Sequence, residues 1–155
     1  MTRFRSQTLD LLPIRTVCAT RGWGRLPQMG GSPRATIVYA EDEPAVQRLV
    51  EFWLEDAGYR VILAADGVEG LAAVREHQPD LLITDALMPN LTGDELVEQL
   101  QADPELRGIP IVMATAAASP ARVRRMTELG CRAVVAKPLE EESFLAAVRA
   151  ALGEG

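Results

Sequence analysis

The sequence predicts an α/β fold built on a parallel sheet, and two observations support this prediction. From Thr36 onward, short apolar runs alternate with amphipathic segments, which is the pattern of repeated βα units around a parallel sheet. The chain has 155 residues, of which 48% are hydrophobic, so it is long enough for one domain with a substantial core. We therefore expect five strands and five helices.

The five expected strands are the short apolar runs. In chain order they are Thr36–Ala40, Tyr59–Ala64, Asp80–Asp85, Ile111–Thr115 and Ala133–Ala136. Pro79 prevents the preceding helix from continuing into the third run, and Ile109-Pro110 leads into the fourth.

A helix is expected after each strand, with proline, serine and glycine marking the ends. Pro44 suits the first turn of the first helix, and Ser119 caps the fourth ahead of Pro120. The first four helices are expected over Pro44–Gly58, Gly67–Glu76, Gly93–Ala102 and Pro120–Gly130, and the fifth lies in the last apolar stretch.

Apolar residues at helical spacing define the face that each helix is expected to bury. In the first three helices these are Val46, Leu49, Val50, Trp53 and Leu54, then Leu71 and Val74, then Leu96, Val97 and Leu100. In the last two they are Val123, Met126 and Leu129, then Phe144, Leu145, Val148 and Leu152. Arg122, Arg124 and Arg125 form a basic stripe on the fourth helix, which is either a solvated face or a partner contact.

Charge and composition divide the chain into an extension, a domain and a tail. Residues 1–34 contain six Arg and one Asp, whereas residues 35–155 contain ten basic and twenty-one acidic residues. The first segment is rich in Gly and Pro, so we expect a largely disordered basic extension over 1–34, a domain over 35–152 and a tail over 153–155. The extension is alternatively sequence upstream of a true start at Met29. Its sparse arginines without interleaved aromatic residues do not favour nucleic-acid binding.

The two cysteines and the hydropathy pattern indicate the compartment. Cys18 and Cys131 form neither a disulfide framework nor the paired spacing of a zinc site, which fits a reduced cytosol. No apolar run approaches the roughly 18 residues needed to span a bilayer, and no signal-peptide pattern is present. We therefore expect a cytoplasmic protein without membrane contact.

Polar residues end four of the apolar runs, where open α/β sheets hold their ligands. Asp85 ends the third run, Glu41 and Asp42 follow the first, Thr115 ends the fourth, and Lys137 follows the fifth. These side chains are expected to converge on one acidic pocket with one lysine.

The chemistry of such a pocket points to Mg2+ and phosphoryl transfer. Two unit charges ~4 Å apart repel by about 4 kcal/mol at an effective dielectric near 20, so three carboxylates need compensation. Mg2+ prefers oxygen ligands and takes one or two carboxylates together with phosphate oxygens. With the metal and Lys137 drawing charge from an incoming phosphoryl group, Asp85 is predicted to attack phosphorus and form an aspartyl phosphate. Thr115 offers a hydroxyl to one phosphoryl oxygen.

Four motifs occur in order, each at a strand end. They are Glu41-Asp42-Glu43-Pro44, Asp85-Ala86-Leu87-Met88-Pro89 with Gly93, Thr115-Ala116 and Lys137-Pro138. With these motifs, residues 35–152 resemble the response-regulator receiver domain of two-component signalling and phosphorelays. The resemblance implies a flavodoxin-like (βα)5 fold with strand order 2-1-3-4-5 and helices on both faces.

The resemblance also implies a role for each site residue. Asp85 would accept phosphate from a histidine kinase or phosphotransfer protein, with Thr115 and Lys137 completing the site. Mg2+ would be held by Asp42, Asp85 and the Leu87 backbone carbonyl, with Glu41 acting through water.

The chain departs from the family pattern in two places. Val134 stands where many members place Tyr or Phe, so the aromatic switch that couples the threonine to the last helices is missing. Leu87 and Ala117 are apolar at the two positions that usually tune the lifetime of the phosphate.

The function expected from these features is that of a stand-alone receiver whose phosphorylation changes its affinity for an unknown output protein. It would be a monomer or a weak phosphorylation-dependent dimer, and would catalyse only its own phosphorylation and dephosphorylation. One alternative is a phosphorylation-independent receiver-like interaction module. A second is a phosphohydrolase with an aspartyl nucleophile, but such enzymes usually carry a second acid where this chain has Leu87.

Overall fold

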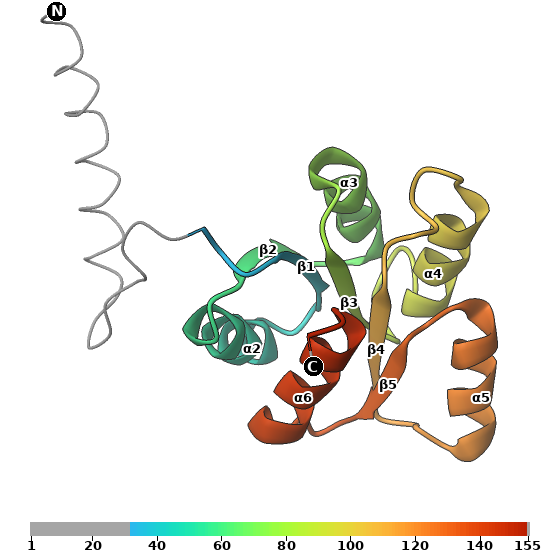
Figure 1. The fold of residues 1–155 in the computed structure, drawn as a ribbon. Helices are drawn as coiled ribbons and strands as arrows, with labels where there is room; N and C mark the ends of the chain where they lie inside the picture. Colours follow the sequence, from blue (N-terminus) through green and yellow to red (C-terminus); the bar gives the residue numbers. More distant parts are fainter. Residues whose placement is uncertain (1–31, 155) are drawn as a thin grey trace, which may run out of the picture. The chain divides into compact units, whose positions relative to one another are not determined.

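Strands and helices alternate along residues 32–154, the part of the chain that the computed structural model describes (Figure 1). The strands are β1 (Thr36–Ala40), β2 (Arg60–Ala64), β3 (Leu81–Asp85), β4 (Ile111–Thr115) and β5 (Ala133–Ala136). The helices are α2 (Pro44–Asp56), α3 (Gly67–His77), α4 (Gly93–Ala102), α5 (Pro120–Leu129) and α6 (Glu141–Ala151). The predicted N-terminal extension, with Cys18, lies outside the described residues except for its last three positions.

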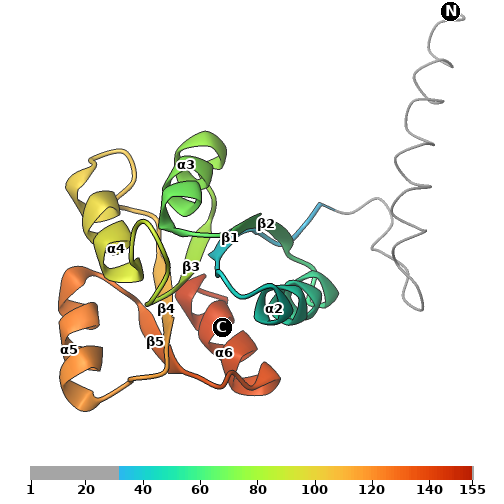
Figure 2. The same cartoon turned by 180° about the vertical axis from the view of Figure 1, so that it is seen from behind.

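The five strands form one parallel sheet in the order β2-β1-β3-β4-β5, which confirms the expected strand order. Helices α2 and α6 cover one face of this sheet, and α3, α4 and α5 cover the other (Figures 1 and 2). Because every strand runs in the same direction, the carboxyl ends of all five meet at one edge.

Each face of the sheet has its own core. Under α2 and α6, alternate residues of β1 and β3 pack against Val50, Leu54, Phe144 and Val148. The opposite residues of the strands pack against Val74, Leu96, Val97, Leu100 and Met126 from α3, α4 and α5. Strands buried on both faces explain why their sequences are continuous apolar runs.

The helix faces agree with the predicted ones except at Leu49. That side chain is 48% exposed, whereas Val50, Trp53 and Leu54 are buried. At 3.6 residues per turn, Val50, Trp53 and Leu54 form the buried stripe of α2, and Leu49 lies at one edge of it. Phe52, which is 63% exposed, lies beyond Leu49 on that side. The expectation that Leu49 joins the core is therefore wrong.

Two arginines of the basic stripe on α5 form bridges to α4. Arg122 Nη2 lies 2.5 Å from Asp94 Oδ1, and Arg125 Nη2 lies 3.6 Å from Glu98 Oε2. The stripe is therefore in part an intramolecular contact that joins the two helices.

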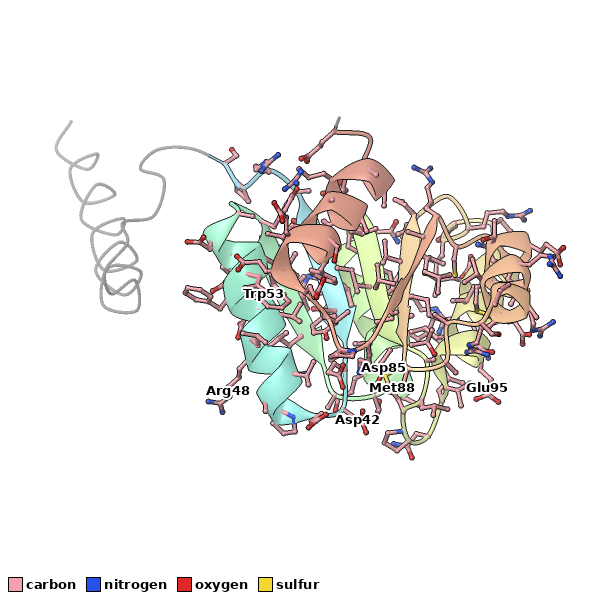
Figure 3. All side chains as sticks on the ribbon, turned by 90° about the horizontal axis from the view of Figure 1, so that it is seen from below. Asp42, Arg48, Trp53, Asp85, Met88 and Glu95 are labelled. Atoms are coloured by element: carbon pink, nitrogen blue, oxygen red, sulfur yellow. The ribbon has the colours of Figure 1, made fainter. Side chains whose placement is uncertain are left out.

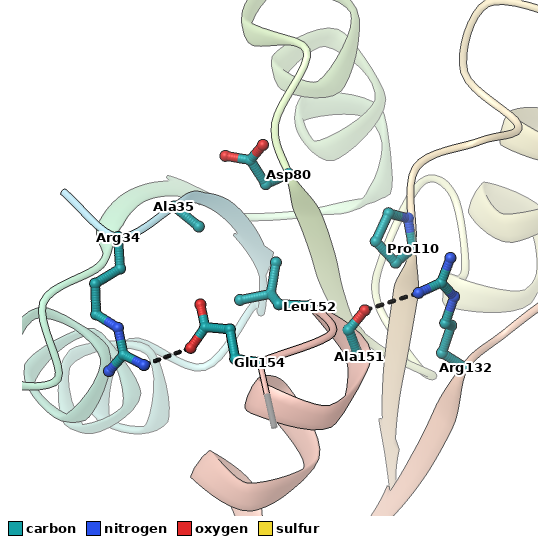
Figure 4. A pocket seen from close by; sticks show the side chains of 8 residues that line it. All are labelled: Arg34, Ala35, Asp80, Pro110, Arg132, Ala151, Leu152 and Glu154. Atoms are coloured by element: carbon teal, nitrogen blue, oxygen red, sulfur yellow. Dashed lines mark hydrogen bonds and ion pairs between the residues drawn. The ribbon is translucent and has the colours of Figure 1, made fainter. Parts of the chain in front are cut away.

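The amino ends of the strands surround a shallow pocket of about 250 Å³ (Figure 4). Its lining includes residues that precede four strands: Ala35, Asp80, Pro110 and Arg132. Beside it, the Arg34 guanidinium pairs with Glu154 and lies 5.0 Å from the centre of the Tyr59 ring. This pocket is at the opposite edge of the sheet from the predicted acidic site. Within residues 32–154, the helices are too short or too polar to cross a membrane.

Candidate phosphoryl-acceptor site

The ends of β1, β3, β4 and β5 carry the polar residues that the sequence singled out. Asp85 is the last residue of β3 and Thr115 the last of β4, while Glu41 and Lys137 directly follow β1 and β5. Asp42 and Asp85 lie at the same end of the sheet in Figure 3. The parallel register therefore gathers the predicted residues at one edge.

Three carboxylates come together there. Glu41, Asp42 and Asp85 each offer an oxygen, and these oxygens all lie within 4.8 Å of one another. Glu41 and Asp85 are buried, whereas Asp42 is exposed. Carboxylate oxygens at this spacing are hard donors that fit Mg2+, because a divalent cation relieves their mutual repulsion.

Lys137 provides the positive charge among these acids. Its Nζ lies 3.0 Å from Glu41 Oε1 and 3.2 Å from Asp85 Oδ2. Burial alone lowers the pKa of Lys137, but the hydrogen bond from its ammonium to Glu41 and the charges of both carboxylates outweigh burial and raise it. The lysine therefore stays protonated at neutral pH, and it is the only lysine of the chain.

Glu41 has a further partner that sequence reasoning missed. The Tyr39 hydroxyl donates to Glu41 Oε1 at 3.1 Å, and the Glu43 backbone N–H donates to Oε2 at 3.1 Å. Burial, and then the charge of Glu41, raise the pKa of Tyr39, so the hydroxyl keeps its proton. The spacing of Tyr39 and Glu41 in the sequence indicates this contact, since residues two apart in a strand project to the same face.

The backbone around Asp85 is held tightly. Asp85 Oδ1 accepts a hydrogen bond from the Ala86 N–H at 2.8 Å, and the Gly93 N–H donates to the Ala86 carbonyl at 2.9 Å. Gly93 lies so close that a Cβ there would be 2.1 Å from the Asp85 carbonyl oxygen. The loop from β3 to α4 therefore fixes where the Asp85 carboxylate points. Within this loop, the Leu87 side chain is 77% exposed.

Thr115 lies at the neighbouring strand end, and its Oγ1 accepts a hydrogen bond from the Ala117 N–H at 3.0 Å. The residue is buried, whereas Ala116 and Ala117 are exposed. Val134, on β5, is partly buried and packs against the core under α3, α4 and α5. The roles of Thr115 and of the Leu87 carbonyl toward a phosphoryl group and a metal stay predictions.

Comparison with known proteins points to one family. Residues 37–149 match the response regulator receiver domain. The chain is 33% identical over 119 residues to the polar-differentiation response regulator DivK of Brucella anthropi. The aligned region covers 77% of this chain and 97% of that protein.

Solved structures agree with this match. The chemotaxis response regulator CheY4 of Vibrio cholerae has a TM-score of 0.71 and 31% identity, covering 76% of this chain and 98% of that one. The receiver domain of the sensor histidine kinase PA1611 from Pseudomonas aeruginosa has a TM-score of 0.71 and 26% identity, covering 79% and 99%; it carries a magnesium ion in its active-site cleft. With the strand order and the acidic edge of the sheet, these matches show that the chain belongs to the response-regulator receiver family.

Proposed function

We propose that this receiver accepts a phosphoryl group on Asp85 from the phosphohistidine of a histidine kinase or phosphotransfer protein. The observation that carries the proposal is the surrounding of Asp85: a protonated lysine 3.2 Å from one carboxylate oxygen, and two further carboxylates within reach of a shared cation. This combination attracts a phosphoryl group and its metal ion and leaves a carboxylate as the nucleophile.

The proposed metal is Mg2+, with Asp42 and Asp85 as carboxylate ligands and the Leu87 carbonyl as a third. Asp42 is exposed, so its oxygens are open to an ion that keeps several waters. Both oxygens of Glu41 already accept hydrogen bonds from protein donors, which favours an indirect contact through water. The magnesium in the PA1611 receiver domain supports the choice of ion. When bound, Mg2+ withdraws charge from the phosphoryl oxygens.

The proposed chemical step is an in-line transfer to the carboxylate. An Asp85 oxygen forms a bond to phosphorus while the bond from phosphorus to the histidine nitrogen breaks, and the departing imidazole takes a proton from water. Lys137 then pairs with a phosphoryl oxygen, and the Thr115 hydroxyl donates to another. Water later cleaves the oxygen–phosphorus bond, which releases inorganic phosphate and restores the carboxylate. In this proposal the domain catalyses only the phosphorylation of its own Asp85 and the reversal of that modification.

The proposed output is a change in affinity for a partner protein. The switch requires two conformations that the partner distinguishes. A monomer or weak phosphorylation-dependent dimer, and a cytoplasmic location, stay predictions.

Two alternatives are less well supported. A module that works without phosphorylation would have no need for a buried carboxylate pair held by Lys137, since burying charged groups is costly. A phosphohydrolase would use an acid two residues after the nucleophile, where the exposed Leu87 side chain offers none.

Incubation with acetyl phosphate and Mg2+, followed by intact-mass measurement, tests the proposal. Wild type should gain one phosphoryl mass, and Asp85→Asn should gain none, because the amide is not a nucleophile for phosphorus. Equal labelling of wild type and Asp85→Asn would reject Asp85 as the acceptor.

A further inference from the structure

The Glu41 carboxylate lies in a buried network of three donors. Its Oε1 accepts from the Tyr39 hydroxyl at 3.1 Å and from Lys137 Nζ at 3.0 Å, while Oε2 accepts from the Glu43 N–H at 3.1 Å. Glu41 is 1% exposed and Tyr39 is fully buried. Because bulk water has little access at this depth, the carboxylate depends on these donors.

The two donors on Oε1 differ in their freedom to move. Lys137 reaches Glu41 through a long, flexible side chain that is 20% exposed and also contacts Asp85. The Tyr39 ring is packed in the core beneath α2 and α6, so its hydroxyl has a fixed position. If Lys137 shifts toward a phosphoryl group on Asp85, Tyr39 is the donor that remains on Oε1.

We propose that Tyr39 is a positioning residue for phosphoryl acceptance: its hydroxyl keeps the buried Glu41 carboxylate paired and in place while Lys137 moves from Glu41 to the phosphoryl group. The inference rests on the proposed function. Without the hydroxyl, Oε1 would be left with Lys137 alone, and transfer of the lysine would leave Oε1 without a protein donor, with only the Glu43 N–H still on Oε2. The hydroxyl therefore lowers the cost of releasing Lys137.

Tyr39→Phe tests this directly, because it removes one oxygen atom and leaves the ring in the core. The initial rate of phosphorylation by acetyl phosphate, at saturating Mg2+ and well below the unfolding midpoint, should fall about tenfold. The chain offers a matched control in its only other tyrosine: the Tyr59 hydroxyl donates to Glu154 at 3.0 Å, at the opposite edge of the sheet. Tyr59→Phe should keep the wild-type rate.

Two further measurements separate positioning from a merely structural role. In a Glu41→Gln background the carboxylate charge is absent, so adding Tyr39→Phe should slow phosphorylation less than twofold. Without metal or phosphodonor, a protein labelled with [15N]lysine has one side-chain ammonium group, that of Lys137. Its hydrogen exchange, followed by NMR, should be slower in Tyr39→Phe than in wild type, since Glu41 then holds the lysine more firmly.

The outcomes distinguish this inference from the proposed function. If wild type takes up no phosphoryl group, the proposed function fails, and the ammonium exchange still reports on Tyr39. If wild type is phosphorylated, any of three results refutes the role of Tyr39. The first is phosphorylation of Tyr39→Phe at the wild-type rate, and the second is that Tyr39→Phe slows phosphorylation by the same factor with Glu41→Gln as without it. The third result is Lys137 ammonium exchange in Tyr39→Phe that is as fast as in wild type.

Discussion

Substitution of Gly93 by alanine should disturb the fold and the site together. Gly93 opens α4 against the backbone of Asp85. A Cβ at this position would lie 2.1 Å from the Asp85 carbonyl oxygen and 3.0 Å from the Ala86 Cα, and both are backbone atoms that no rotamer change can move aside. Overpacking of this kind typically lowers the free energy of unfolding by about 1–3 kcal/mol. The higher helix propensity of alanine offsets less than about 1 kcal/mol of this loss.

A net loss of roughly 2 kcal/mol corresponds to an unfolding midpoint lower by on the order of 5–10 °C for a domain of this size. Gly108→Ala is the matched control, because a Cβ there has no atom within 4 Å, so its midpoint should stay within about 2 °C of wild type. Thermal unfolding followed by circular dichroism measures both variants.

A Cβ at position 93 should also displace the Asp85 backbone and so slow the phosphorylation of Asp85. A shift of about 1 Å in a reacting group can cost up to roughly a hundredfold in rate, so Gly93→Ala should also be phosphorylated more slowly by acetyl phosphate at a temperature where it is folded. Equal midpoints for Gly93→Ala and Gly108→Ala, or an unchanged phosphorylation rate in Gly93→Ala, would refute the argument from close backbone contact.

Three further predictions concern the phosphate, the metal and the buried thiol. Leu87 and Ala117 offer no polar group to a hydrolytic water, so Leu87→Asn combined with Ala117→Glu should shorten the lifetime of the phosphorylated form; equal or slower decay would contradict this. Asp42→Ala should weaken Mg2+ binding severely and Glu41→Ala less, and titrations that rank them in reverse would exchange their roles. Burial raises the pKa of the Cys131 thiol to about 12. With the other cysteine replaced by serine, the folded protein should therefore resist iodoacetamide at pH 8 and react once unfolded. Since the unfolded thiol loses its proton at lower pH than the folded one, Cys131 should contribute a loss of stability of about 1.4 kcal/mol per pH unit above pH 9, and Tyr39, whose pKa is also raised, should add to the loss above pH 10.

The sequence was sufficient for features that depend on local pattern. The bounds of α4 and the end of β3 follow from glycine, proline and apolar periodicity, and the structure has them where they were expected. The meeting of Asp42, Asp85 and Lys137 follows from parallel strands ending at one edge, so it too could be predicted.

Features that depend on distances between elements could not be predicted. The i, i+2 spacing places Tyr39 and Glu41 on one face, but that Lys137, directly after β5, shares Glu41 Oε1 with the Tyr39 hydroxyl depends on how the strand ends lie in space. The pairing of Arg122 with Asp94 likewise depends on how α5 lies against α4. Leu49 was misplaced because the width of a buried helix face is set by what covers it.

The single lysine of this chain decides how the protein can be handled. Apart from the amino terminus, Lys137 is the only aliphatic amine in 155 residues. An acylating biotin or dye ester, or amine coupling to a sensor surface, that attaches to a side chain therefore attaches beside Asp85 and removes the cation of the site. Partner affinities measured on protein tethered in this way would describe a receiver that has lost its lysine charge, so immobilisation should use a terminal tag.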